Sequence, residues 1–157
     1  GSGLLCLMIA QKCDALIHGI DINSEAVDIA RQNVAESDWS QRIEIFDSAV
    51  QAFRPSEKYD LIVSNPPYYS TDVPAPEKGR ALARHDNRLS HSQLAEAIDR
   101  LMAEDGRCFV IYPTDAAEDF ENHAREYGLC VRKKLLVSSR ANSPHIRQIL
   151  MLERQSG

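Results

Sequence analysis

The sequence lacks any apolar run that approaches the roughly 20 residues needed to span a bilayer. It also lacks a segment with the pattern of a cleavable signal peptide. Its cysteines are few, lie scattered in apolar stretches, and form neither a CxxC pair nor a zinc-ligand spacing: Cys6, Cys13, Cys108 and Cys130. We therefore predict buried, reduced thiols, no metal, no membrane partner and a cytoplasmic protein.

Basic residues are outnumbered, but they are unevenly distributed. The chain has 18 Lys and Arg against 23 Asp and Glu, and a net charge of −5 alone argues against a nucleic-acid partner. Residues 129–147 nevertheless hold five cationic residues and no acid, and residues 76–91 hold four against two acids. Such segregation can create an anion-binding face on an acidic body, although two solvated loops explain it equally well.

Predicted strands alternate with predicted helices along the 157 residues. Apolar runs predict strands at residues 15–22, 43–46, 59–64, 107–112, 129–137 and 148–153. This alternation predicts an α/β fold with a doubly wound, mostly parallel sheet of the Rossmann-like kind. The composition does not shift along the chain, so we expect one domain over residues 1–157.

Capping residues and apolar periodicity indicate the helices. Asn23 or Ser24 begins a helix with the buried face Val27, Ala30 and Val34. Two further apolar faces are Leu94, Ala97, Ile98, Leu101 and Met102, and then Ala116, Phe120, Ala124 and Tyr127. We expect Gly106 and Gly128 to end these two helices, and Thr114 to begin the second.

The chain opens with apolar residues at helical spacing, a stripe that starts at Leu4, whereas a doubly wound fold normally begins with a strand. Gly1-Ser2-Gly3 can be the end of a glycine-rich strand-to-helix turn, or a remnant of expression. We favour the first interpretation, because the stripe follows immediately. The domain is then expected to be truncated and to lack its first strand.

The strongest functional signal is Asn65-Pro66-Pro67-Tyr68, directly after the apolar residues 61–64. In an open α/β sheet, ligands bind outside the carboxyl ends of the strands. The Asn65 side-chain oxygen and the Pro66 carbonyl could accept both hydrogens of a planar amino group, while Tyr68 offers a face for stacking. This pattern predicts methyl transfer to such a nitrogen, with Asn65 to Tyr68 as catalytic residues.

Asp21 ends an earlier predicted strand, where a carboxylate can accept hydrogen bonds from both ribose hydroxyls of a nucleoside cofactor. Ile22 beside it, and Gly1 and Gly3 of the opening turn, belong to the same predicted cofactor site. Asp47-Ser48 ends the next strand and could meet the cofactor adenine, but generic turn chemistry explains this pair as well.

This order of elements resembles the class I S-adenosylmethionine-dependent amino-methyltransferases. Within them, the chain is similar to the bacterial tRNA adenine-N6 methyltransferases that modify valine tRNA beside the anticodon. The resemblance covers residues 1–153, and its most specific parts are Gly1-Ser2-Gly3-Leu4-Leu5, Asn65-Pro66-Pro67-Tyr68-Tyr69, Ala83-Arg84-His85 and Pro144-His145. At the third motif, Ala49 stands where an acid is expected, two positions after Asp47.

The resemblance implies S-adenosyl-L-methionine as donor and tRNA as partner, with Asp21 on the donor ribose and Asn65 also near the donor. It implies that residues 65–68 hold a flipped-out adenine. Candidate RNA contacts are Tyr69, Arg84, His85, Lys133, Lys134, Arg140 and Arg147. We interpret His91 as a helix-start residue.

Three alternatives stay open on the sequence. A glutamine amide is also a planar NH2, so a glutamine-N5 methyltransferase of release factors would use the same tetrapeptide. Amino-methylation of ribosomal RNA or DNA follows the same logic. An inactive chain that keeps only the fold is the third.

Overall fold

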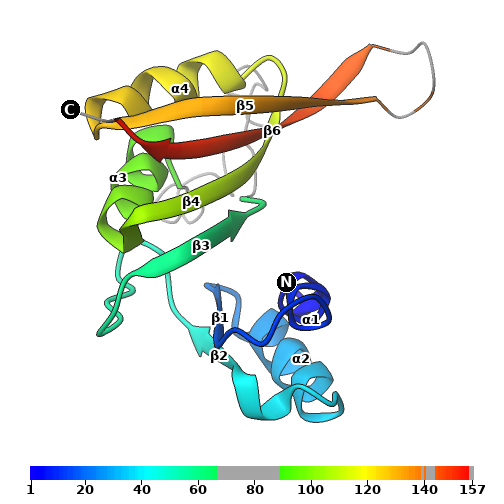
Figure 1. Cartoon of the computed structure of the whole chain (residues 1–157). Coiled ribbons are helices and arrows are strands. Elements are labelled where there is room, and N and C mark those ends of the chain that lie inside the picture. The colour runs from blue at the N-terminus through cyan, green and yellow to red at the C-terminus, as the bar shows by residue number, and fades with distance from the viewer. Residues whose placement is uncertain (67–88, 139, 141–143, 156–157) are drawn as a thin grey trace, which may run out of the picture. The chain divides into compact units, whose positions relative to one another are not determined.

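The structure, a computed structural model, describes residues 1–66, 89–138, 140 and 144–155 (Figure 1). The chain divides into two compact units, Gly1–Arg54 and Pro55–Gly157, and each is described by itself. Within the described ranges, no helix is both long and apolar enough to cross a membrane.

The first unit is built on a two-stranded parallel sheet. Its elements are α1 (Leu4–Ala10), β1 (Ile17–Asp21), α2 (Ser24–Ala35), a short 3₁₀ turn (Ser40–Arg42) and β2 (Ile43–Asp47). The predicted buried face of α2 is confirmed, since Val27, Ala30 and Val34 pack in one cluster with the strand residues Ile17, Ile43 and Ile45. Asn23 caps α2 by accepting the Ala26 N–H at 3.1 Å, as predicted.

Arg42 ties this unit together around the end of α1. Its guanidinium donates to the carbonyl oxygens of Ala10, Cys13 and Ala15 at 3.0–3.1 Å. Backbone carbonyls at the end of a helix have no partner within it, so one charged side chain here satisfies Ala10 and the two loop carbonyls.

The second unit holds a four-stranded sheet in the order β3-β4-β6-β5 (Figure 1). Its elements are β3 (Tyr59–Ser64), α3 (His91–Leu101), β4 (Met102–Pro113), α4 (Ala117–Glu126), β5 (Leu129–Ser138) and β6 (His145–Arg154). The β3–β4 pair is parallel, whereas β6 runs antiparallel to both β4 and β5. Both helices contribute to one core cluster with the strands, in which Phe120 stacks on Tyr112 at a centroid distance of 4.5 Å.

Two predicted helix boundaries are wrong. Gly106 does not end a helix, because α3 ends at Leu101 and Gly106 lies inside β4. The pairing of β4 with β3 changes register there, and a Cβ at Gly106 would lie only 2.8 Å from Met102 Cγ and 2.9 Å from the Tyr59 carbonyl oxygen. Gly106 therefore permits β4 to approach β3 closely at an irregularity in the sheet.

Thr114 does not cap α4 either. Ala116 takes the cap position without a side-chain hydrogen bond, and the Thr114 hydroxyl donates instead to the His145 carbonyl at 3.0 Å. Gly128 does close α4, as predicted, with φ at +70° and its N–H bonded to the Arg125 carbonyl.

The thiols are free, as predicted, but they are not all buried. Cys108 lies fully in the core, Cys6 and Cys130 are partly buried, and Cys13 is exposed. Burial raises the pKa of the Cys108 and Cys6 thiols, because desolvation disfavours the thiolate. The expectation failed at Cys13 because α1 ends at Ala10, which leaves this residue in the exposed segment that leads to β1.

We predict that Gly106→Ala lowers the free energy of unfolding by about 1–3 kcal/mol, because the new methyl must displace Met102 or the β3 backbone. Urea unfolding monitored by circular dichroism measures the loss. The neighbouring exposed position provides the control, since Asp105→Ala should change stability by less than about 0.5 kcal/mol. Equal effects of the two substitutions would show that β4 does not approach β3 this closely.

Candidate functional site

The carboxyl ends of β1 and β2 place two carboxylates side by side. The strands are parallel and Asp21 pairs in register with Asp47, so both residues stand at the same edge of the two-stranded sheet. The chain after β2 is held to this edge, because the Ser48 N–H donates to the Asp21 carbonyl at 3.0 Å. The edge is the place where the sequence predicted a cofactor site.

The Asp21 side chain connects the start of the chain to this edge. Its Oδ1 accepts the Asn23 N–H at 2.9 Å, and its Oδ2 pairs with the amino group of Gly1. A carboxylate offers about four lone-pair positions, so two remain. A pair of ribose hydroxyls requires two acceptor positions, so the Asp21 carboxylate fits the nucleoside cofactor expected from the sequence.

Gly3 sits at the turn into α1 in a conformation that favours glycine. Its φ is +78°, and a Cβ there would lie 3.2 Å from the Ala30 Cβ on α2. Its carbonyl accepts the Leu7 N–H at 3.1 Å and so begins the helix. Both backbone conformation and space restrict this position, and together they bring residues 1–3 alongside α2.

Asp47 and Ser48 are engaged in local hydrogen bonds. Asp47 Oδ2 accepts the Ser24 hydroxyl at 2.8 Å, and the Ser48 hydroxyl donates to the Ala49 carbonyl at 3.1 Å. Ile22, beside Asp21, exposes half of its surface. An exposed apolar side chain next to a carboxylate suits a ligand that has both a flat apolar ring and hydroxyl groups.

Asn65 and Pro66 follow the end of β3 in the second unit, and Asn65 is exposed while Pro66 is buried. This placement at the carboxyl end of a parallel strand agrees with the sequence-based expectation. The other predicted residues of this region, Pro67, Tyr68, Tyr69, Arg84 and His85, lie outside the described residues.

The basic candidates on the last two strands differ in their surroundings. Lys134 Nζ lies 2.5 Å from Oε1 of Glu121, a carboxylate on α4 whose side chain is only 8% exposed. Lys133 is exposed and makes no ion pair with any described residue. Arg140 and Arg147 are also exposed. Lys134 thus has a structural partner, whereas Lys133 points its charge to solvent.

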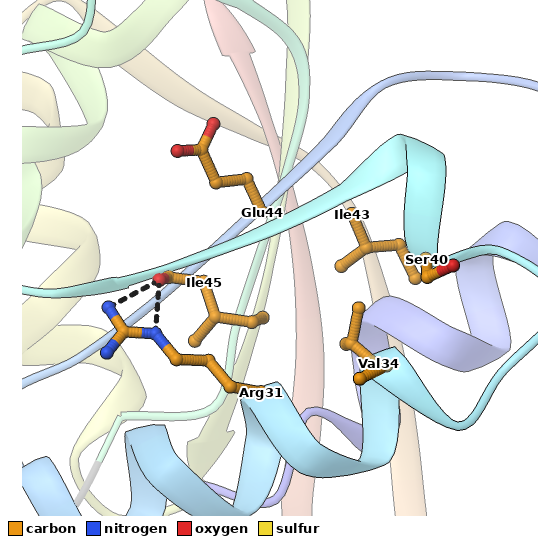
Figure 2. A pocket seen from close by; sticks show the side chains of 7 residues that line it. Arg31, Val34, Ser40, Ile43, Glu44 and Ile45 are labelled. Atoms are coloured by element: carbon orange, nitrogen blue, oxygen red, sulfur yellow. Dashed lines mark hydrogen bonds between the residues drawn. The ribbon is translucent and has the colours of Figure 1, made fainter.

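A hollow on the surface of the first unit lies away from the predicted site (Figure 2). It measures about 360 Å³ and lies between α2 and β2, lined by Arg31, Val34, Ala35, Ser40, Ile43, Glu44 and Ile45. Arg31 crosses it and donates through Nε and Nη2 to the Ile45 carbonyl at 3.1 and 3.0 Å. Neither Asp21 nor Asp47 lines it.

One cluster escaped sequence reasoning altogether. His91, interpreted as a helix-start residue, lies against Asp119 and His123 of α4. The signal that could have indicated it is Asp119-x-x-x-His123, an i, i+4 pair that shares one face of a helix.

Comparison with known families decides what kind of chain this is. Residues 1–110 match the model of the methyltransferase small domain. The chain belongs to this family. The match begins at the Gly1–Gly3 turn and runs past Asp21, Asp47 and residues 65–68, so it includes every residue predicted to bind the methyl donor and every residue predicted to be catalytic.

Curated relatives carry more specific names. A "tRNA1(Val) (adenine(37)-N6)-methyltransferase" of Phocaeicola vulgatus is 39% identical over 150 residues, 96% of this chain and 64% of that protein. A relative of the same name from Pedobacter heparinus is 36% identical over 98% of this chain and 66% of its own length. The chain thus spans about two thirds of the length of these relatives.

Solved structures confirm the fold class. The N-methyltransferase NodS of Bradyrhizobium japonicum, determined in complex with S-adenosyl-L-homocysteine, superposes with a TM-score of 0.68. The match covers 99% of this chain and 74% of NodS at 15% identity. The chain therefore has the Rossmann-like class I fold that the sequence predicted.

We predict that Lys134→Ala lowers the free energy of unfolding by about 1–2 kcal/mol, because it leaves the buried Glu121 carboxylate without its nearest cation. The expected loss of stability is smaller than for a fully buried ion pair, because Lys134 is 47% exposed and Arg125 stays 3.8 Å from Glu121. Lys133→Ala, one residue earlier on the same strand, is the control and should change stability by less than about 0.5 kcal/mol. Thermal unfolding of both variants measures the difference, and equal midpoints would exclude the ion pair.

Proposed function

We propose that this chain is the catalytic part of a cytoplasmic, S-adenosyl-L-methionine-dependent methyltransferase that methylates the exocyclic N6 amine of an adenine in tRNA. The observation that carries the proposal is an intact Asn-Pro-Pro-Tyr directly after β3, in a chain 39% identical to a relative named for this reaction. Valine tRNA, modified next to the anticodon, is the substrate that the relatives' names favour.

The donor side of the proposed site is the edge formed by β1 and β2. Asp21 holds the ribose with its two remaining acceptor positions, and Ile22 covers one face of the adenine. The turn at Gly1–Gly3 approaches the donor with backbone alone, since Gly3 carries no side chain. Asp47 and Ser48 complete the adenine end through the groups that their local hydrogen bonds leave available. When bound, the donor supplies an electrophilic methyl group on sulfur.

The acceptor side is the corner that follows β3. An adenine amine is a poor nucleophile because its lone pair is delocalised into the ring. Acceptors at the Asn65 side chain and the Pro66 carbonyl orient its two hydrogens and stabilise positive charge as it develops on nitrogen. The buried Pro66 ring fixes the backbone of this corner, and Tyr68 stacks on the base. No general base is needed at the attack, because the proton becomes acidic only after transfer.

The basic residues of the β5–β6 hairpin are proposed to contact the RNA backbone. In Figure 1 these two strands extend beyond the first turn of α4. Lys133 on β5, Arg147 on β6 and Arg140 between the two strands are all exposed, and this hairpin forms a basic arm. Each phosphate contact releases condensed counterions, so binding through this arm must weaken as salt rises. Lys134 contributes less in this proposal, because Glu121 neutralises it. Tyr69, Arg84 and His85 follow the acceptor corner in sequence and are proposed to contact the flipped nucleotide's neighbours.

Transfer of a radiolabelled methyl group tests the proposed substrate. The chain, expressed with any residues that flank it in its gene, is incubated with labelled donor and either unmodified tRNA or release factor. We expect label in tRNA, recovered after digestion as N6-methyladenosine. Label in the release factor would replace the proposal with glutamine methylation, and label in ribosomal RNA or DNA would change the substrate. Donor binding without transfer to any of these would leave a chain that keeps only the fold.

Asn65→Ala should lower the transfer rate by roughly 100-fold or more, because it removes an acceptor that acts on the incoming nitrogen. Donor affinity, measured by calorimetry, should stay largely intact, because the Asn65 amide acts mainly on the acceptor nitrogen. Asn122→Ala on α4 is the matched control and should keep full activity. Retained turnover in Asn65→Ala would refute the role of the acceptor corner.

Asp21→Ala should weaken donor binding by about 1.5–3 kcal/mol, the range of hydrogen bonds to a charged group. Asp14→Ala, which removes an exposed carboxylate of the same unit, should leave the affinity unchanged. Calorimetric titration of both variants decides the point, after circular dichroism has shown that both are folded. Unaltered binding by Asp21→Ala would exclude contact with the ribose.

A further inference from the structure

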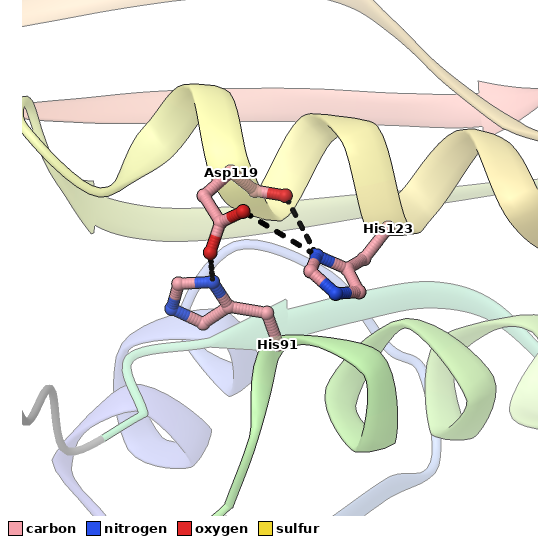
Figure 3. Close-up of side chains that lie close together, drawn as sticks. All are labelled: His91, Asp119 and His123. Atoms are coloured by element: carbon pink, nitrogen blue, oxygen red, sulfur yellow. Dashed lines mark hydrogen bonds and ion pairs between the residues drawn. The ribbon is translucent and has the colours of Figure 1, made fainter. Parts of the chain in front are cut away.

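Two imidazoles and a carboxylate meet between α3 and α4, in a part of the second unit that the proposed methyl transfer does not use (Figure 3). His91 is the first residue of α3, while Asp119 and His123 lie one turn apart on α4. Each side chain offers one potential ligand atom, and these three atoms lie within 4.8 Å of one another.

The contacts show that both histidines face the same carboxylate. His91 Nδ1 lies 2.8 Å from Asp119 Oδ2, and His123 Nδ1 lies 3.8 Å from Asp119 Oδ1. His123 Nδ1 also bonds to the Asp119 backbone carbonyl at 2.9 Å. Figure 3 shows the carboxylate above both rings with its oxygens directed at them. Both imidazoles therefore direct Nδ1 toward the Asp119 carboxylate, and His123 shares its Nδ1 with a backbone carbonyl.

The packing holds the cluster and leaves it accessible. The His91 ring is fixed by edge contacts with Tyr112 and Phe120, at centroid distances of 5.4 and 6.4 Å. The His91 and His123 side chains are only 28% and 34% exposed, whereas Asp119 is 65% exposed. An ion can thus approach from the carboxylate side and meet imidazoles that are already oriented.

The ligand types select the ion. Imidazole nitrogen with one carboxylate suits Zn²⁺ and neighbouring first-row metals, whereas Mg²⁺ and Ca²⁺ prefer sets made only of oxygen. We propose that His91, Asp119 and His123 bind one Zn²⁺ ion, with water in the fourth position.

The proposed site requires a small rearrangement. Tetrahedral bonds of about 2.0–2.1 Å place neighbouring ligand atoms roughly 3.4 Å apart. The 2.8 Å between His91 Nδ1 and Asp119 Oδ2 must lengthen by about 0.6 Å to reach this distance. His123, whose side chain is 34% exposed, must rotate away from its own helix carbonyl. The ion then joins the first turn of α3 to α4 and fixes where α3 begins.

Calorimetric titration of ZnCl₂ into the metal-stripped chain, prepared without a polyhistidine tag, tests the proposal. We expect one ion per chain and a Zn²⁺-dependent rise in the melting temperature. His123→Gln and Asp119→Asn should each weaken binding roughly tenfold or more. Replacement by Co²⁺ should give visible absorption of a site with nitrogen ligands, which His123→Gln should alter. MgCl₂ should give no binding heat.

Two histidines elsewhere provide matched controls. His145 bonds to Ser138, and His18 lies near Glu44 in the other unit. His145→Gln and His18→Gln should bind Zn²⁺ as the parent does. The proposal is overturned if these controls weaken binding as much as His123→Gln, if no variant alters it, or if Mg²⁺ binds equally well. In each of those cases the cluster is only a hydrogen-bonded contact between helices.

Discussion

The parallel pairing of β1 with β2 is the constraint on which the donor side of the site depends. Parallel strands end at the same edge, so residues that lie 26 positions apart, Asp21 and Asp47, become neighbours without any direct bond between them. The two carboxylates avoid strong mutual repulsion because each accepts hydrogen bonds, Asp21 from Asn23 and Gly1 and Asp47 from Ser24. The strand register thus brings the two acidic residues together, and donors from the Asn23 backbone, the Gly1 amino group and the Ser24 hydroxyl stabilise their carboxylates.

Two adjacent lysines on β5, Lys133 and Lys134, have different roles. Successive side chains of a strand point to opposite faces, so Lys133 and Lys134 cannot share one environment. Lys134 faces α4 and neutralises Glu121, a buried carboxylate whose other cation, Arg125, is 3.8 Å away. Lys133 faces solvent and remains available for a polyanion. In this basic segment, Lys134 therefore stabilises the fold, whereas Lys133 adds positive potential to the surface.

Local signals predicted most of the fold, and contacts distant in sequence account for the errors. The faces of α2 and α4, the Asn23 cap and the Gly128 terminus depend on spacing within a few residues, and all are confirmed. Gly106 and Thr114 failed because their roles depend on partners far along the chain, Tyr59 on β3 and His145 on β6. The predicted position of Asn65 after a strand agrees with the structure, because an apolar run followed by prolines marks a strand end locally.

The same distinction explains why the histidine cluster could not be found by spacing alone. A zinc motif read from sequence needs at least two close ligand pairs, and here only Asp119 and His123 form one. His91 joins them because the capping box of Ser90 and Gln93 begins α3 at that residue, while Tyr112 and Phe120 orient the ring. A local capping signal thus determines a non-local ligand position. A shift of the helix start by one residue would turn His91 by about 100° and separate it from Asp119.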